Sequence, residues 1–177
     1  LPATAARTVE QVAAVGSYAL PIGPWMDGRV ESWPVEGEVT QTAWRIRDAN
    51  KTTLALLTPL RDQLKAEGFN VLFECETDIC GGFDFRYATD ILPEPEMHVD
   101  LGDFRFLSAR RDIGDTADFV SLLVSRSSES GYVQMTRIGA EVSAPIMQAE
   151  VQSEAIEEAV LSASTLSERL DATGSVV

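Results

Sequence analysis

The sequence predicts an α+β domain, with a mainly antiparallel sheet, two helices on one face and a long C-terminal amphipathic helix. Three observations lead to this fold class. After residue 103, apolar segments follow one another with short turns between them, as in antiparallel strands. Two earlier segments repeat apolar residues at helical spacing. Residues 150–171 contain no aromatic residue and carry only a thin apolar stripe, which is typical of an amphipathic helix.

Residues 1–36 are rich in proline, glycine and aromatic residues. Prolines restrict such a segment to turns, edge strands or extended chain, so we expect it to pack on the surface of a domain formed by residues 37–145. Residues 38–47 are predicted to form the first strand of that domain, with alternate residues on its two faces. One face of this strand would carry Thr40, Thr42, Trp44 and Ile46.

A helix is predicted next, with Thr52 or Thr53 as its N-terminal cap and Gly68 as its end. Pro59 predicts either a kink or a helix that starts one turn later, at Thr58. Four leucines recur at helical spacing behind the cap: Leu54, Leu57, Leu60 and Leu64.

Residues 70–75 predict a short apolar strand, and Gly81 and Gly82 interrupt the chain after it. A short second helix follows, with Phe83, Tyr87 and Ile91 on one face, and residues 93–102 form a polar loop. The remaining strands are predicted at residues 104–111, 118–127 and 132–138.

Residues 146–177 are predicted to be a helical linker, with an apolar stripe of Ile156, Val160, Leu166 and Leu170. A stripe this thin could dock on the domain, mediate homo-oligomerisation or connect the domain to another one.

The charge and the termini restrict the function classes. A net charge of −14 repels nucleic acid and anionic lipid. No apolar run approaches the ~20 residues of a transmembrane helix, so the chain is predicted not to span a membrane. The N-terminus has no basic and apolar signal regions, but its small residues are compatible with a mature end after signal removal.

Cys75 and Cys80, the only cysteines, lie between a predicted strand and a predicted helix. Their spacing is wider than that of a redox dithiol, and the single histidine, His98, is too few for a zinc site with these thiols. The pattern favours a structural disulfide, with free thiols as the alternative.

Glu94, Glu96, His98 and Asp100 occupy alternate positions, so an extended chain would place three carboxylates and an imidazole on one side, where they could bind a divalent cation. A solvated acidic loop is the commoner outcome, and no metal or cofactor is predicted. An acid pair such as Asp84 and Asp90 could serve a hydrolase, but paired carboxylates in so acidic a chain are mostly surface residues.

Seven aromatic residues are interpreted as core, with a ligand pocket as the alternative: Phe69, Phe73, Phe83, Phe85, Tyr87, Phe104 and Phe106.

Five segments carry a family resemblance, and the cysteine-bearing part is the most specific: residues 57–64, 68–75, 80–86, 95–107 and 124–127. They resemble the N-terminal region of OmpA-family envelope proteins of Rhodobacter-type proteobacteria. They are also similar, more loosely, to a family of uncharacterised periplasmic proteins with an "L-x-P-L…G-x-x-V-L-F/Y-E-C…C-G" signature. The resemblance covers roughly residues 10–140.

The resemblance implies a periplasmic, outer-membrane or cell-wall-associated protein whose signal peptide has been removed. It also implies a downstream peptidoglycan-binding OmpA-like domain, which this sequence lacks, so residues 146–177 would lead toward it. We therefore expect a non-enzymatic module that presents a surface to another envelope protein. The alternatives are a small-ligand or metal-binding domain that uses residues 94–103 or an aromatic pocket, and, third, a hydrolase.

Overall fold

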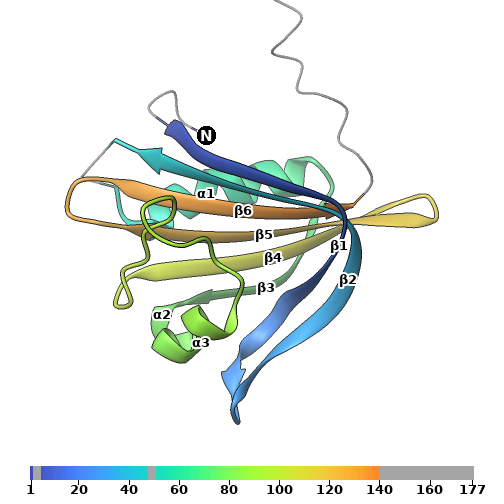
Figure 1. The fold of residues 1–177 in the computed structure, drawn as a ribbon, viewed down its shortest axis with the longest axis horizontal. Helices are drawn as coiled ribbons and strands as arrows, with labels where there is room; N and C mark the ends of the chain where they lie inside the picture. Colours follow the sequence, from blue (N-terminus) through green and yellow to red (C-terminus); the bar gives the residue numbers. More distant parts are fainter. Residues whose placement is uncertain (2–4, 48–50, 140–177) are drawn as a thin grey trace, which may run out of the picture. The chain divides into compact units, whose positions relative to one another are not determined.

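A computed structural model describes residues 1, 5–47 and 51–139, and a six-stranded antiparallel sheet forms its centre (Figure 1). The strand order is β1-β2-β6-β5-β4-β3. The strands are β1 (Ala5–Met26), β2 (Arg29–Ile46), β3 (Asn70–Glu76), β4 (Phe104–Ile113), β5 (Thr116–Arg126) and β6 (Gly131–Gly139). The helices are α1 (Thr53–Ala66), α2 (Thr77–Cys80) and α3 (Gly82–Ala88).

The predicted α+β class, with two helices on one face, is wrong. The described part of the chain is mainly β, with 19% helix, and its helices lie on both faces of the sheet. The main cause is the proline-rich N-terminal segment, which forms β1 and the start of β2. Pro21 is tolerated because β1 is an edge strand. Pro34 precedes Glu38, where β2 begins to pair with β6.

The β1–β2 hairpin bends sharply, so that its far end runs back across the sheet (Figure 1). Gly16 lies opposite Gly37 in this hairpin, and a register irregularity separates Ala13 from Gly16. A Cβ on Gly16 would come within 2.9 Å of Val39 Cγ2, so the close approach of the strands requires glycine. Beyond the bend, Ser108 Oγ on β4 donates to Pro21 O at 2.6 Å, which fastens β1 over the sheet.

Helix α1 confirms the predicted capping and the leucine pattern. The Thr52 side chain accepts a hydrogen bond from Ala55 N at 3.2 Å, as an N-cap does. The helix continues through Pro59, so the alternative start at Thr58 is wrong. Leucines at positions 56, 57, 60 and 64 are buried against the sheet, whereas Leu54 is exposed.

The N-terminal end of α1 is tied to the β3–β4 connection through Asp103. Thr53 Oγ1 donates to Asp103 Oδ1 at 2.7 Å, and Arg126 Nε donates to Oδ2 at 2.6 Å. Burial acts to raise the pKa of Asp103, but the hydrogen bonds from Thr53 and Arg126 outweigh it and lower the pKa below its ordinary value. The carboxylate is therefore ionised at neutral pH and holds the helix in place.

Two cores lie on opposite faces of the sheet. Beneath α1, its leucines pack on alternate residues of β4, β5 and β6, such as Leu107, Leu122 and Val133. On the other face, α2, α3 and residues 89–103 cover a second core that includes Phe85 and Phe106. The predicted C-terminal helix falls within residues 146–177, outside the described residues.

Candidate functional site

The disulfide-braced turn is the feature in which sequence and structure agree most closely. Cys75 in β3 and Cys80 at the end of α2 form a disulfide, with their Cα atoms 5.2 Å apart. This confirms the favoured prediction and removes the free-thiol alternative. Gly81 follows with a φ of 111° as the N-cap residue of α3, and a Cβ there would meet Trp25 Cβ at 2.8 Å. The turn is thus held by the cross-link and by the far end of β1.

Hydrogen bonds fix the same turn to β4. Thr77 Oγ1 donates to Phe104 O at 3.0 Å and accepts from Phe104 N at 2.8 Å. Because Thr77 is the first residue of α2, this exchange anchors the helix at the end of the sheet. The short helices therefore form a rigid cap, in which Cys80 and Phe85 are fully buried.

Removal of the disulfide is expected to lower the free energy of unfolding by about 2 kcal/mol, because it frees a short loop in the unfolded chain. The measurement is urea unfolding of Cys75→Ala/Cys80→Ala beside the wild type, with and without reductant. Reductant should lower the free energy of unfolding of the wild type to nearly that of the variant. It should leave the free energy of unfolding of the variant unchanged. A variant as stable as the oxidised wild type would contradict this account of the turn.

Three large apolar side chains protrude from this cap. The exposed fractions of Ile79, Phe83 and Tyr87 are 63%, 58% and 65%. The rings of Phe83 and Tyr87 are 4.5 Å apart, and the Arg86 guanidinium lies 5.3 Å from the Tyr87 ring centre. We call Ile79, Phe83 and Tyr87 the apical patch. Exposed large apolar side chains gathered on neighbouring helices are typical of a protein interaction surface.

The interpretation of Phe83 and Tyr87 as core residues is wrong. Helix α3 turns Phe85 inward, where it contacts Phe104 and Phe106, and this leaves Phe83 and Tyr87 on the outer side. Sequence spacing could not choose between these faces, because every second residue from 83 to 87 is aromatic. Elsewhere the interpretation is correct for Phe69, Phe85, Phe104 and Phe106, which are buried, while Phe73 is half-buried.

Two carboxylates adjoin the apical patch in the chain. Asp78 and Asp84 are both exposed and are the immediate neighbours of Ile79 and Phe83 in the chain. Arg86 is half-buried, and burial lowers its pKa below the ordinary value, partly offset by the charges of Tyr87 and Glu94. A partner surface that combines an apolar centre with basic residues would complement this arrangement.

The acidic residues of the loop do not converge. His98 Nδ1 lies 2.6 Å from Glu94 Oε1, so these two are brought together. Glu96 instead fastens the loop to β1, since its backbone oxygen accepts from Thr8 Oγ1 at 2.8 Å. Asp100 Oδ1 accepts from Gly102 N at 2.8 Å within its own turn. Among the residues that the structure describes, no group of three or more His, Cys, Asp or Glu side chains could hold a metal ion.

Asp84 and Asp90, the acid pair considered for a hydrolase, lie in different structural settings. Asp90 Oδ2 accepts a hydrogen bond from Gln41 Nε2 on β2 at 3.1 Å, which ties the segment after α3 to the sheet. Asp84 is exposed in the first turn of α3, next to the apical patch.

A line of buried hydroxyl groups crosses the sheet on the face opposite α1. In the strand register, Ser108 on β4 lies opposite Ser121 on β5, and Ser121 lies opposite Thr136 on β6. We call these three residues the hydroxyl ladder. Their exposed fractions are 0%, 3% and 1%. This buried polar line was not predicted from the sequence, because serine alternating with apolar residues is also usual for a strand with one solvent-facing side.

Tyr18 of β1 closes over the hydroxyl ladder, with its phenol oxygen 3.0 Å from Ser121 Oγ. Burial raises the pKa of Tyr18 above its ordinary value, and hydrogen bonds with Ser121 and Thr136 only partly oppose this effect. The phenol is therefore neutral at neutral pH. Because a substrate cannot reach hydroxyls buried to this degree, the ladder is a structural network rather than a catalytic one.

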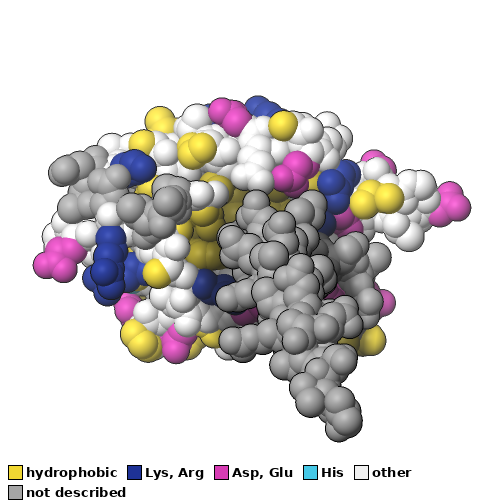
Figure 2. Space-filling model, turned by 90° about the horizontal axis from the view of Figure 1, so that it is seen from above, with side chains coloured by type: hydrophobic (Ala, Val, Ile, Leu, Met, Phe, Trp, Pro, Cys, Tyr) yellow, Lys and Arg dark blue, Asp and Glu magenta, His cyan; other side chains and the backbone are white. Residues whose placement is uncertain are grey.

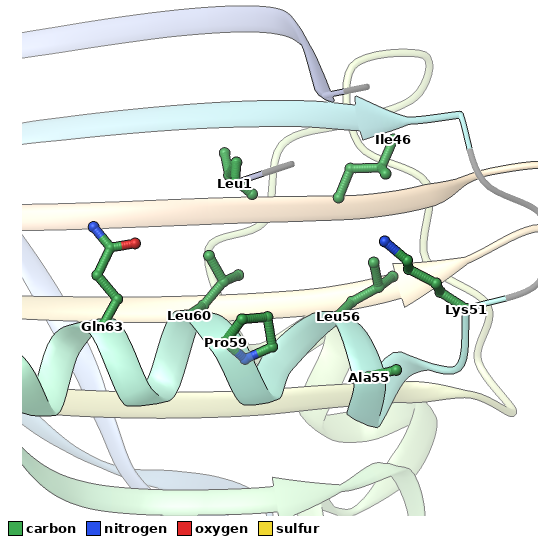
Figure 3. Close-up of a pocket in the computed structure, with 8 residues that line it drawn as sticks. All are labelled: Leu1, Ile46, Lys51, Ala55, Leu56, Pro59, Leu60 and Gln63. Carbon is green, nitrogen blue, oxygen red and sulfur yellow. The ribbon is translucent and has the colours of Figure 1, made fainter. Parts of the chain in front are cut away.

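An apolar hollow of about 290 Å³ opens between α1 and the sheet (Figure 3). Leu56, Pro59 and Leu60 of α1 form one wall, Ile46 of β2 forms the opposite one, and polar side chains stand at its margins. The remaining lining residues are Leu1, Lys51, Ala55 and Gln63. Sequence analysis missed this hollow because it depends on where α1 rests on the sheet.

Comparison with models of known protein families finds no match, and comparison with curated proteins finds none either. Across residues 1, 5–47 and 51–139, no helix combines the length and the apolar character needed to cross a membrane.

Proposed function

We propose that this domain is a non-enzymatic interaction module of an exported OmpA-family cell-envelope protein, and that it binds another envelope protein through the apical patch. The observation that carries the proposal is the exposure of Ile79, Phe83 and Tyr87 on helices that a disulfide holds rigid. A rigid apolar surface loses little conformational entropy on binding, which favours affinity. The disulfide supports an oxidising compartment such as the periplasm, and the assignment to the envelope rests on the sequence resemblance of residues 10–140.

The partner surface should be apolar at its centre and basic at its edge. Exposed Asp78 and Asp84 flank the patch, and the whole chain carries a net charge of −14. Such charges would steer a basic partner and repel an acidic one. Association should therefore become slower as ionic strength rises, while the apolar centre sets the lifetime of the complex.

The test is site-specific photo-crosslinking in cells of the source bacterium, with a photoreactive residue at position 83 or at position 113. Ile113, in the β4–β5 hairpin, is also an exposed large apolar residue and serves as the matched control. We expect a discrete protein adduct from position 83 and none from position 113. Equal labelling from both positions, or none from position 83, would contradict the proposal.

Loss of two patch side chains should weaken partner binding at least tenfold, because central aromatic residues dominate interface energies. Purified Phe83→Ser/Tyr87→Ser should therefore compete for the crosslinked adduct at least tenfold less well than the wild type. Ile113→Ser should compete like the wild type. Both variants should keep the wild-type urea midpoint within error, since exposed substitutions change stability by about 0.5 kcal/mol or less.

A further inference from the structure

Helix α1 covers only part of its face of the sheet. Its backbone lies closest to β3, β4 and β5, and its leucines also pack on the same face against Val133 of β6 and Ile46 of β2. There Val133 is buried, while Trp44 and Met135 are only half-buried and pack against the edge of the core. An apolar strip of sheet thus remains beside the helix. Figure 2 shows hydrophobic side chains at the bottom of the hollow in this region of the molecule.

Two hollows lie along α1 and share a wall. The first, of about 290 Å³, reaches from Lys51 to Gln63, and the second, of about 170 Å³, reaches from Leu60 to Arg137. Leu60 and Gln63 line both, so the two hollows adjoin along the helix, and we call them together the groove. From Ala55 to Glu67 the groove is about 18 Å long, at 1.5 Å per helical residue.

Arg137 lines the second hollow, and it shares a carboxylate partner with Arg111, which does not line it. Arg111 Nη2 and Arg137 Nη2 both donate to Asp118 Oδ2, at 2.6 and 3.1 Å. Arg111 also donates to Glu67 O at 3.1 Å, and its guanidinium lies 4.5 Å from the centre of the Phe69 ring, which lines the hollow. Two guanidinium groups thus share one carboxylate oxygen. Their remaining N–H groups can donate hydrogen bonds to a second anion.

The charges near this end of the groove include one further carboxylate. Glu67 lines the second hollow, and its Oε1 accepts a hydrogen bond from Gln63 Nε2 at 2.9 Å. Glu67 is the C-cap residue of α1, whereas Arg137 is on β6 across the groove. A ligand carboxylate would therefore be drawn to the sheet side, against Arg137.

We propose that this groove binds a long-chain aliphatic carboxylate, with its carboxylate on Arg137 and its chain along α1 toward Leu56. The floor and walls are mainly aliphatic, which suits a flexible hydrocarbon chain. The length of the groove suits a linear ligand, and the arginine pair supplies the complementary charge in a protein that is otherwise strongly acidic. This site is separate from the apical patch, so it adds a ligand-binding function to the proposed partner binding.

The first test is calorimetric titration of the full 177-residue chain with laurate, myristate and lauryl alcohol, each below its aggregation concentration. We expect saturable binding of laurate, and an affinity for myristate about fifteenfold higher for its two extra methylenes. Lauryl alcohol should bind at least tenfold more weakly than laurate, because it lacks the charge for Arg137. Absence of saturable heat, or a preference for the alcohol, would overturn the proposal.

The second test uses paired variants. Gln63→Phe places a ring where the two hollows meet and should weaken laurate binding at least tenfold. Asp62→Phe makes the same type of change at the next exposed position, which lines neither hollow, and should bind like the wild type. Equal affinities of these two variants would show that the ligand does not occupy the groove.

The third test assigns the headgroup. Arg137→Gln should weaken laurate binding at least tenfold and leave lauryl alcohol binding unchanged, and retained alcohol binding also shows that the groove is intact. Lys51→Gln, at the other end, should leave both affinities unchanged. If Lys51→Gln rather than Arg137→Gln weakens laurate selectively, the proposed orientation is wrong.

Discussion

Replacement of Phe85 by alanine is expected to lower the free energy of unfolding by about 4 kcal/mol. The Phe85 side chain is fully buried, and its ring centre lies 5.1 Å from that of Phe106 and 6.3 Å from that of Phe104. Truncation removes this contact and leaves a cavity under the disulfide-braced turn, which cannot collapse to fill it. Urea unfolding, followed by circular dichroism, measures the change.

Phe83→Ala is the matched control, since it makes the same substitution two residues away in the same helix. Phe83 belongs to the apical patch and is largely exposed, so its truncation should change stability by about 0.5 kcal/mol or less. The pair of variants separates the inner from the outer side of α3. Similar losses from both variants would mean that α3 is turned differently on the sheet.

Replacement of Asp118 by alanine is expected to lower the free energy of unfolding by about 3 kcal/mol. Its side chain is only 7% exposed and accepts from both Arg111 and Arg137 through one oxygen. Without it, two guanidinium groups remain close together and partly buried, and the buried Nε atoms of both already make no hydrogen bond. The measurement is again urea unfolding, at low and at high salt, because screening should reduce the loss.

Asp112→Ala is the control for Asp118→Ala. Asp112 pairs with Arg110 near the β4–β5 turn, but its side chain is 62% exposed, and exposed ion pairs contribute about 0 to 1 kcal/mol. We expect a small effect from this variant and a large one from Asp118→Ala. If both variants lose little free energy of unfolding, Asp118 is not needed to stabilise Arg111 and Arg137. The positive charge that we assign to this end of the groove would then be wrong.

Local signals in the sequence predicted the elements that local contacts stabilise. The Thr52 cap and the leucine repeat predicted α1, and the turn between Arg126 and Gly131 predicted the β5–β6 hairpin. The cysteine spacing predicted the disulfide, because its two ends lie close in the chain. These features can therefore be predicted with little knowledge of the rest of the fold.

Long-range contacts account for what the sequence did not predict. Strand β1 looked like a surface segment because of its prolines, and only its place at the sheet edge makes them acceptable. Ser108 and Ser121 are covered by the returning end of β1, whose contacting residues lie 87 and 103 positions earlier in the chain. The groove beside α1 likewise depends on how far the helix reaches across the sheet, which no local pattern specifies.

The hydroxyl ladder has a consequence for how the strands find their partners during folding. A shift of one residue in the pairing of β5 would turn Ser121 into the leucine core beneath α1 and bring Leu122 under Tyr18. The misaligned sheet would bury a hydroxyl without a partner and lose the contact between Ser121 and Tyr18. The hydroxyl ladder thus raises the free energy of sheets in which the central strands pair one residue out of register. It therefore favours a single register for these strands.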